Sequence, residues 1–317
     1  MKLKPTTIAA LAAIYIAVPL LFGSDNYVMS LIIASLIIGG IALSWALLGN
    51  LGGMVSFGHA AFFGVGAYTS AVLSMQYHVP VFVALVLGGV GAVVAALAML
   101  PVLRLRGPYF ALAILAYAHI FRIVASEWTS VTGGAAGIGN IPRLPVLFGV
   151  DFSSKTGNYL VILTIVLVFA AAYALIRRSP HGLALRAMHD SDDATRVVGV
   201  NNTLLKGMML MVSAFMCGMV GAFNAHYINF LEPDYAFSAL WVTIPIVAAI
   251  FGGYRTITGP LIGAVVVYLV DQLIVKNILP SGHQMILGVL LVGMIIASPD
   301  GLLSLVKKFT RKKDAAT

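Results

Sequence analysis

Charged residues are scarce in this chain of 317 residues. Asp, Glu, Lys and Arg make up 9% of it, whereas roughly 25% is usual in a soluble globular protein. This scarcity excludes a soluble enzyme, and with 60% hydrophobic residues the chain is not disordered, collagen-like or a coiled coil. The sequence has instead a series of separated apolar runs of membrane-spanning length. These predict an all-α polytopic membrane protein that forms a single transmembrane domain over residues 1–317.

The chain also has a single cysteine and none of the enzyme motifs considered below. The one cysteine, Cys217, lies in an apolar run, so it forms no internal disulfide and is best explained as a small core side chain. No phosphate-binding loop of the form GxxxxGK[ST] occurs, so any nucleotide hydrolysis must come from another polypeptide. His59 and His119 lack the spacing of metal ligands, and no nucleophile, base and orienting group form a catalytic set. We expect no catalytic residue, no metal site and no cofactor bound by this chain.

The apolar runs predict about ten transmembrane helices, with Gly-rich broken segments between some of them. The third, eighth and tenth runs are short enough to be broken or re-entrant. The first follows Lys2 and Lys4 and is interpreted as a retained span and not as a signal peptide. The ten expected spans cover residues 8–22, 28–48, 60–76, 81–103, 109–126, 159–176, 208–225, 239–251, 260–278 and 284–298.

The positive charges indicate the orientation of these spans. With the N-terminus in the cytoplasm, the inner segments hold 15 of the 19 Lys and Arg residues, including those of the basic tail 299–317. The outer segments hold only Arg143, Lys155 and Lys276. Because cytoplasmic loops are enriched in basic residues, this bias favours ten spans with both termini in the cytoplasm.

Two loops are too long to be simple connections. The outer loop, 127–158, contains the Gly-rich stretch TGGAAGIGN and two prolines, and we expect it to fold back over the mouth of the bundle. Both a docking surface for a binding protein and a lid remain open for it. The inner loop, 177–206, is the most charged part of the chain before the tail.

The inner loop predicts two short helices at the membrane surface. Ser179 as N-cap and Pro180 at the first helical position begin one helix, which should run to about His189. Asp190 or Ser191 begins a second, which Gly199 should end. Leu183, Ala187 and Met188 share one face of the first helix, and Arg186 and His189 lie off it. That face either packs on the protein's own spans, with the basic residues near anionic lipid, or docks into a groove of a soluble partner.

Glycines are concentrated at two junctions between spans. The segment 50–68, NLGGMVSFGHAAFFGVGAY, predicts a break whose freed backbone groups line a translocation path. The alternative interpretation of this segment is a turn with packing of small residues, for which Gly49 and Gly53 have the GxxxG spacing. At the second junction, 252–263, we expect a packing role at the inner end of the bundle.

Few polar residues lie within the spans, and such residues usually face the bundle interior. They are His59, His119, Arg122, Asn224, Asp271 and Gln272. Asp271 could pair with Arg122 or with Lys276, and most of these groups are explained well enough by structural ion pairs or by snorkelling.

In this order and spacing, five segments resemble the membrane permeases of the branched-chain amino acid ABC importers, of the LivM type. The resemblance covers nearly the whole chain. Its segments are GGMVSFGHAAFFGVGAYTSA (52–71), RLRGPYFALAILAYAHIFR (104–122), TGGAAGI (132–138), RRSPHGLALRAMHDSDDATRVVGV (177–200) and GGYRTITGPLIGA (252–264).

The resemblance implies a subunit of the bacterial inner membrane that forms a heterodimer with a related permease. It also implies two ATPase subunits that hold ATP and Mg, an extracytoplasmic substrate-binding protein and no nucleic acid partner. The inner loop would couple to the ATPases, although it departs from the family pattern over residues 186–192. The same family also serves urea and short amides, and a self-sufficient ion-coupled carrier using Asp271 and the histidines is the rival hypothesis.

Two groups of residues are the candidates for function under this resemblance. The path would be lined by Ser56, Phe57, Gly58 and His59, at the first glycine-rich junction. Coupling to the ATPase would use Gly182, Leu183, Leu185, Arg186 and Met188 of the inner loop.

Overall fold

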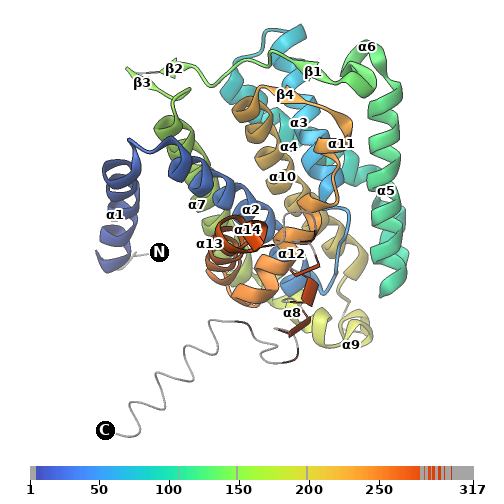
Figure 1. Cartoon of the computed structure of the whole chain (residues 1–317). Helices are drawn as coiled ribbons and strands as arrows, with labels where there is room; N and C mark the ends of the chain where they lie inside the picture. The colour runs from blue at the N-terminus through green and yellow to red at the C-terminus, as the bar shows by residue number, and fades with distance from the viewer. Residues whose placement is uncertain are drawn as a thin grey trace, which may run out of the picture.

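The computed structural model describes residues 5–278, except 106, 148 and 198, and the separate residues 282, 285, 286, 288, 289, 292, 293, 296 and 301. Its longer helices are α1 (Pro5–Phe22), α2 (Asn26–Gly52), α3 (His59–Gln76), α4 (Val81–Ala98), α5 (Pro108–Glu127), α7 (Lys155–Arg178), α10 (Asn202–Ile228), α12 (Leu240–Gly252) and α13 (Gly259–Val270). They form a helical bundle (Figure 1).

Seven helices of the described residues are long and apolar enough to cross a membrane. They are α2, α4, α5, α7, α10, the segment Pro233–Gly252 and the segment Gly259–Ile278. The chain is therefore a multi-pass helical membrane protein, but the expected number of ten spans is not supported. The tenth expected span, 284–298, and the basic tail 299–317 lie almost entirely outside the described residues.

The third expected span is a helix, α3, that is not among these seven. It carries a histidine, two internal glycines and several hydroxyl groups, which lower its hydropathy. Most of its residues are buried, because it packs against α4 and α10. A helix covered by protein does not need lipid-compatible side chains. Hydropathy alone therefore underestimates the ability of α3 to cross the membrane.

Small residues bring α3, α4 and α10 together. A side chain on Gly66 of α3 would overlap the backbone of Gly218 in α10, and one on Gly221 would overlap the backbone of Phe63. A side chain on Gly218 would also meet Ala92 of α4. Such close backbone approach is the usual way in which helices associate in membranes.

One end of the bundle carries the loop 127–158, at the top of Figure 1. This loop contains α6 (Thr129–Thr132), the short turn η2 (Gly134–Ala136) and the strands β1 (Ile138–Gly139), β2 (Val146–Leu147) and β3 (Val150–Asp151). It folds back across the bundle, where β1 pairs antiparallel with β4 (Phe230–Leu231), and β2 pairs with β3.

Side chains hold this returning loop in place. Asn229 Nδ2 donates to the Ile141 carbonyl at 3.1 Å, and Arg143 Nε donates to Asn229 Oδ1 at 3.0 Å. His226 Nδ1 lies 2.6 Å from the Pro142 carbonyl. The loop is thus fastened to the end of α10 and to the turn that follows it.

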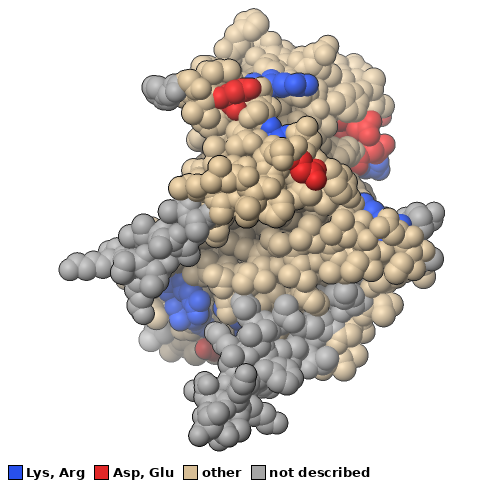
Figure 2. All heavy atoms as spheres, turned by 60° about the vertical axis from the view of Figure 1, so that its left-hand side comes forward, with Lys and Arg blue, Asp and Glu red and all other residues tan. Residues whose placement is uncertain are grey.

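The opposite end carries the inner loop, with α8 (Pro180–Asp190) and α9 (Asp192–Val197), at the bottom of Figure 1. The remaining elements are the turn η1 (Leu100–Arg104), α11 (Pro233–Ala236), the π-helical turn η3 (Asp271–Val275) and α14 (Lys276–Ile278). Figure 2 shows one face of the molecule, on which most of the described surface carries no charged residue.

Candidate functional site

The glycine-rich junction between α2 and α3 is a break in helical structure. α2 ends at Gly52, and Gly53 takes a left-handed conformation with φ of 63°. Residues 53–58 are not helical, and α3 begins at His59. Gly49 does not contact another helix at its Cα, because the nearest atoms to a side chain there would belong to Trp45 of the same helix. The GxxxG packing considered for Gly49 and Gly53 is therefore not observed.

His59 joins three segments at this break. Its Nε2 lies 2.9 Å from Ser213 Oγ of α10, and its Nδ1 lies 3.2 Å from Ser56 Oγ. The Ser213 hydroxyl donates to the Ser44 carbonyl of α2 at 2.9 Å. The Cys217 thiol donates to the His59 carbonyl at 3.2 Å. His59 is completely buried, so its ring holds the start of α3 against α2 and α10.

The four path candidates of the sequence occupy different environments. Ser56, Gly58 and His59 are buried, whereas Phe57 is 39% exposed. The Ser56 carbonyl accepts a hydrogen bond from Trp45 Nε1 at 2.9 Å, which fixes the break to α2. Of the four residues, Phe57 is the one that lines a cavity. A path-lining role for the set remains a prediction.

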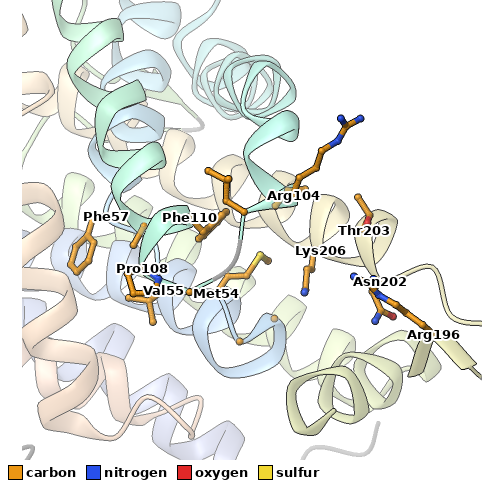
Figure 3. A pocket seen from close by; sticks show the side chains of 16 residues that line it. Met54, Val55, Phe57, Arg104, Pro108, Phe110, Arg196, Asn202, Thr203 and Lys206 are labelled. Carbon is orange, nitrogen blue, oxygen red and sulfur yellow. The ribbon is translucent and has the colours of Figure 1, made fainter. Parts of the chain in front are cut away.

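A cavity of about 770 Å³ opens beside the break at the inner end. Figure 3 shows Met54, Val55 and Phe57 on one side of it and Asn202, Arg196 and Lys206 on the other. α5 contributes Pro108, Phe110 and Ala111. The charged residues that line it are all basic: Arg104, Arg196 and Lys206.

A second cavity, of about 370 Å³, lies between α3 and α5 near their outer ends. Its lining is mostly apolar and includes Val65, Tyr68, Phe121 and Trp128. Between the two cavities, Gly58 lies directly against Ile114 of α5, and a side chain on Gly58 would overlap it. We call the boundary of α5 with the break and α3 the seam. It contains an inner cavity beside the break, a tight contact at Gly58 and an outer cavity beside α3.

The inner loop begins as its sequence indicates. Ser179 Oγ accepts a hydrogen bond from Gly182 N at 3.2 Å, and Pro180 occupies the first turn of α8. Ser191 Oγ accepts from Ala194 N at 3.3 Å at the start of α9. These caps satisfy amide groups that a helix start leaves unpaired.

The buried face of α8 differs from the one expected. Gly182, Leu185 and Met188 are buried, whereas Leu183 is 62% exposed and Ala187 is exposed. The expectation that Leu183, Ala187 and Met188 form one apolar face is therefore wrong. Gly182 decides the orientation, because a side chain there would overlap the Ile176 carbonyl at the end of α7. The helix consequently turns this residue, and those three and six positions later, towards the bundle.

α8 contacts the broken junction directly. It packs against α2, α7 and α10, and a side chain on Gly53 would meet the ring of His189. Arg186, which is exposed, donates from Nη2 to the Arg177 carbonyl at 2.5 Å. α8 thus has one side exposed and contacts, through His189, the Gly53 residue that lines the inner cavity.

The ion pair of Arg122 also differs from the alternatives considered. Its Nη1 lies 2.6 Å from Asp234 Oδ1 of α11, so it does not pair with Asp271. Both groups are largely exposed, with 40% and 79% of their side chains accessible. This pair joins α5 to α11 at the outer end.

Comparison with known proteins assigns the family. Residues 8–295 match the model of the branched-chain amino acid transport system permease component. This chain belongs to that permease family. The permease is 29% identical to the high-affinity branched-chain amino acid permease protein LivM of Salmonella typhimurium, over 94% of its own length and 74% of that protein.

Two further relatives extend the comparison. The permease is 27% identical to LivM of Escherichia coli, over 98% of its own length and 77% of the relative. It is 24% identical to LivH, another branched-chain amino acid permease protein of Escherichia coli, over 83% of its own length and 90% of the relative. No solved structure matches the chain significantly.

Sequence reasoning missed several residues that line the inner cavity of the permease. Val55 and Phe110 lie in segments that had been singled out, but nothing in the sequence indicated that they would face one another across a space. Lys206 had been assigned only to the inner loop, and its position beside Asn202 follows from the start of α10. Cavities depend on side-chain packing between distant segments, which periodicity does not report.

Proposed function

We propose that this permease is a membrane subunit of an ATP-driven importer for branched-chain or related amino acids. It would lie in the bacterial inner membrane, with both termini in the cytoplasm. Its partners would be a second permease related to LivH, two ATPase subunits that hold ATP and Mg, and an extracytoplasmic substrate-binding protein. The family assignment supports transport, and the absence of a phosphate-binding loop from the sequence requires a separate ATPase.

The observation that carries the proposal is the contact between α8 and the α2–α3 break. Leu183 and Arg186 are exposed on α8 and are available to a cytoplasmic partner, while Gly182, Leu185 and Met188 hold the helix on the bundle. Movement of α8 by the ATPases would act on the junction through His189 and Gly53. Because the junction borders the inner cavity, this contact would couple the ATPases to the translocation path.

The arrangement of the seam supports alternating access as the mechanism. In the state described, the contact of Gly58 with Ile114 separates the inner cavity from the outer one. A shift of the 53–58 segment, driven from α8, would change which cavity is continuous with the path. The Ser56 hydroxyl would keep that segment linked to α3 during the shift, because it is hydrogen-bonded to the His59 ring. His59, which also contacts Ser213 of α10, would be the fixed end of the segment.

Reconstitution tests the proposal. Proteoliposomes that contain this permease, the second permease, both ATPases and the binding protein should accumulate leucine only when ATP is supplied. Uptake by the permease alone on a proton or sodium gradient would instead establish the ion-coupled carrier. For coupling, Leu183→Asp should reduce leucine uptake by about tenfold by weakening ATPase docking, since a buried interface charge costs well over 1.4 kcal/mol.

A control variant changes an exposed leucine outside the inner loop. Leu112 of α5 is about as exposed as Leu183 but lies far from the inner loop in the sequence. Leu112→Ala should leave ATPase binding intact, as measured by co-purification of the complex. Equal ATPase binding by Leu183→Asp and the wild type would show that α8 is not the docking element.

A further inference from the structure

Asp271 is a buried acid to which the proposed function has so far given no role. It begins η3, where α13 widens into a π-helical turn. Its side chain is 1% exposed, and neither carboxylate oxygen has a hydrogen-bond partner among the described residues. Ala264, Val267 and Val275 share its face and are buried too, so the carboxylate faces the bundle interior, where α13 packs against α2 and α12.

An unpaired carboxylate in this position is costly. Charged groups within membrane-spanning segments are rare, and those that occur pair with another group or mark a substrate or ion pathway. Arg122, one cation considered for it, is paired with Asp234. No ion pair joins Asp271 to Lys276 among the described residues. The π-helical turn is a second unusual feature, since π-bulges are rare and are frequently found at functional sites.

Tyr268 connects Asp271 to tyrosines of other elements. Tyr268 lies one turn earlier on α13 and interacts electrostatically with Asp271, with Tyr227 of α10 and with Tyr27 of α2. Tyr235 of α11 interacts with Tyr268 and Tyr227. We call Tyr27, Tyr227, Tyr235 and Tyr268 the tyrosine cluster.

The tyrosine cluster already holds one ammonium group. Lys155 Nζ lies 2.8 Å from the Tyr227 hydroxyl and 4.6 Å from the centre of its ring. Aromatic rings attract cations through their electron-rich faces, and hydroxyl groups accept hydrogen bonds from ammonium. A carboxylate next to such rings is the usual chemistry for recognising a primary ammonium group.

We propose that Asp271 and Tyr268 bind the ammonium group of the transported amino acid as it passes through the bundle. The inference rests on the proposed function and deepens it, because it names the chemical group that the permease itself recognises. A neutral substrate such as urea would not compensate the buried carboxylate, whereas a zwitterionic amino acid would. Asp271 would therefore favour amino acids over neutral amides within the same family.

The test measures leucine imported per ATP hydrolysed by the complete reconstituted complex. Asp271→Asn should lower this ratio by about tenfold or more, because a hydrogen bond to a charged partner is lost. Asp271→Glu keeps the charge and should retain a larger share of the ratio than Asp271→Asn. Asp151→Asn is the control, since this acid is exposed in the outer loop, where the Ser153 hydroxyl lowers the pKa of its carboxyl. The control should match the wild type.

The outcomes separate this inference from the proposed function. If the wild-type complex imports no leucine with ATP, the proposed function fails whatever Asp271 does. If the wild type imports leucine and Asp271→Asn keeps the same ratio, the inference is wrong and the proposed function stands.

A second measurement uses the wild-type permease and does not depend on a variant that folds. A hydrophobic carbodiimide labels buried carboxyl groups, and mass spectrometry reports the labelled peptide that contains Asp271. Leucine should slow this labelling at least threefold, whereas 2-hydroxy-4-methylpentanoate, which has a hydroxyl in place of the ammonium, should not. Equal protection by the two compounds, or by neither, would overturn the inference.

Discussion

α3 and α5 face each other across the seam, yet their sequences and surroundings are opposite. α3 carries His59, glycines and hydroxyl groups, and most of its residues are buried by protein. α5 is apolar enough to count as a span, but only 28% of the residues in its most apolar stretch are buried. Figure 1 shows α5 standing at one side of the bundle. The hydropathy of a helix thus depends on whether lipid or protein surrounds it, more than on its ability to cross the membrane.

The largest difference between the two helices should appear when volume is added to each. Gly66→Val in α3 forces a side chain into the backbone of Gly218 and should lower the free energy of unfolding by about 3 kcal/mol. Ala116→Val in α5 adds two methyl groups at an exposed position and should change it by less than about 0.5 kcal/mol. Thermal unfolding in detergent measures both. Similar losses for the two variants would show that α3 is not the more tightly packed helix.

A smaller difference is expected for the histidines of the two helices. His59→Ala leaves the hydroxyls of Ser213 and Ser56 without their ring partners and opens a cavity, at a cost of about 2 kcal/mol. His119 is exposed on α5, so His119→Ala should cost less than about 0.5 kcal/mol. The same unfolding assay applies. A cost for His119→Ala equal to that of His59→Ala would mean that α5 is covered in the isolated chain.

The smallest effect is expected for the ion pair that ties α5 to α11. A double-mutant cycle with Arg122→Ala and Asp234→Ala should give a coupling energy of about 0.5 kcal/mol, because both groups are largely exposed. The coupling should fall further at 0.5–1 M salt, roughly where the screening length drops towards 3 Å. A coupling above about 2 kcal/mol would show that this pair is desolvated and that α5 is held firmly at its outer end.

The sequence predicted the local features of the fold well. Ser179, Pro180 and Gly199 mark the ends of the inner-loop helices because capping depends on a few neighbouring residues. The break before His59 follows in the same way from Gly52, Gly53 and Gly58. Such signals act within one or two turns and need no knowledge of the rest of the chain.

The features that depend on distant contacts were not predictable. Arg122 finds its partner 112 residues later in the sequence, at Asp234, because α11 returns to the outer end of α5. The buried face of α8 follows from the close approach of Gly182 to the end of α7, and not from the pattern of apolar residues. The seven candidate spans leave out α3, whose polar side chains lower its hydropathy and are covered by packing against α4 and α10.

The burial of Cys217 has a practical consequence for following this permease as it works. Its thiol lies inside α10 with no exposed surface and donates to the His59 carbonyl. It is the only cysteine of the chain, so water-soluble thiol reagents should find no reactive site on the native protein. A cysteine introduced at Phe57 or at Val124 would then be the sole point of labelling. Spectroscopic probes could report the inner and the outer cavity one at a time, without first replacing Cys217.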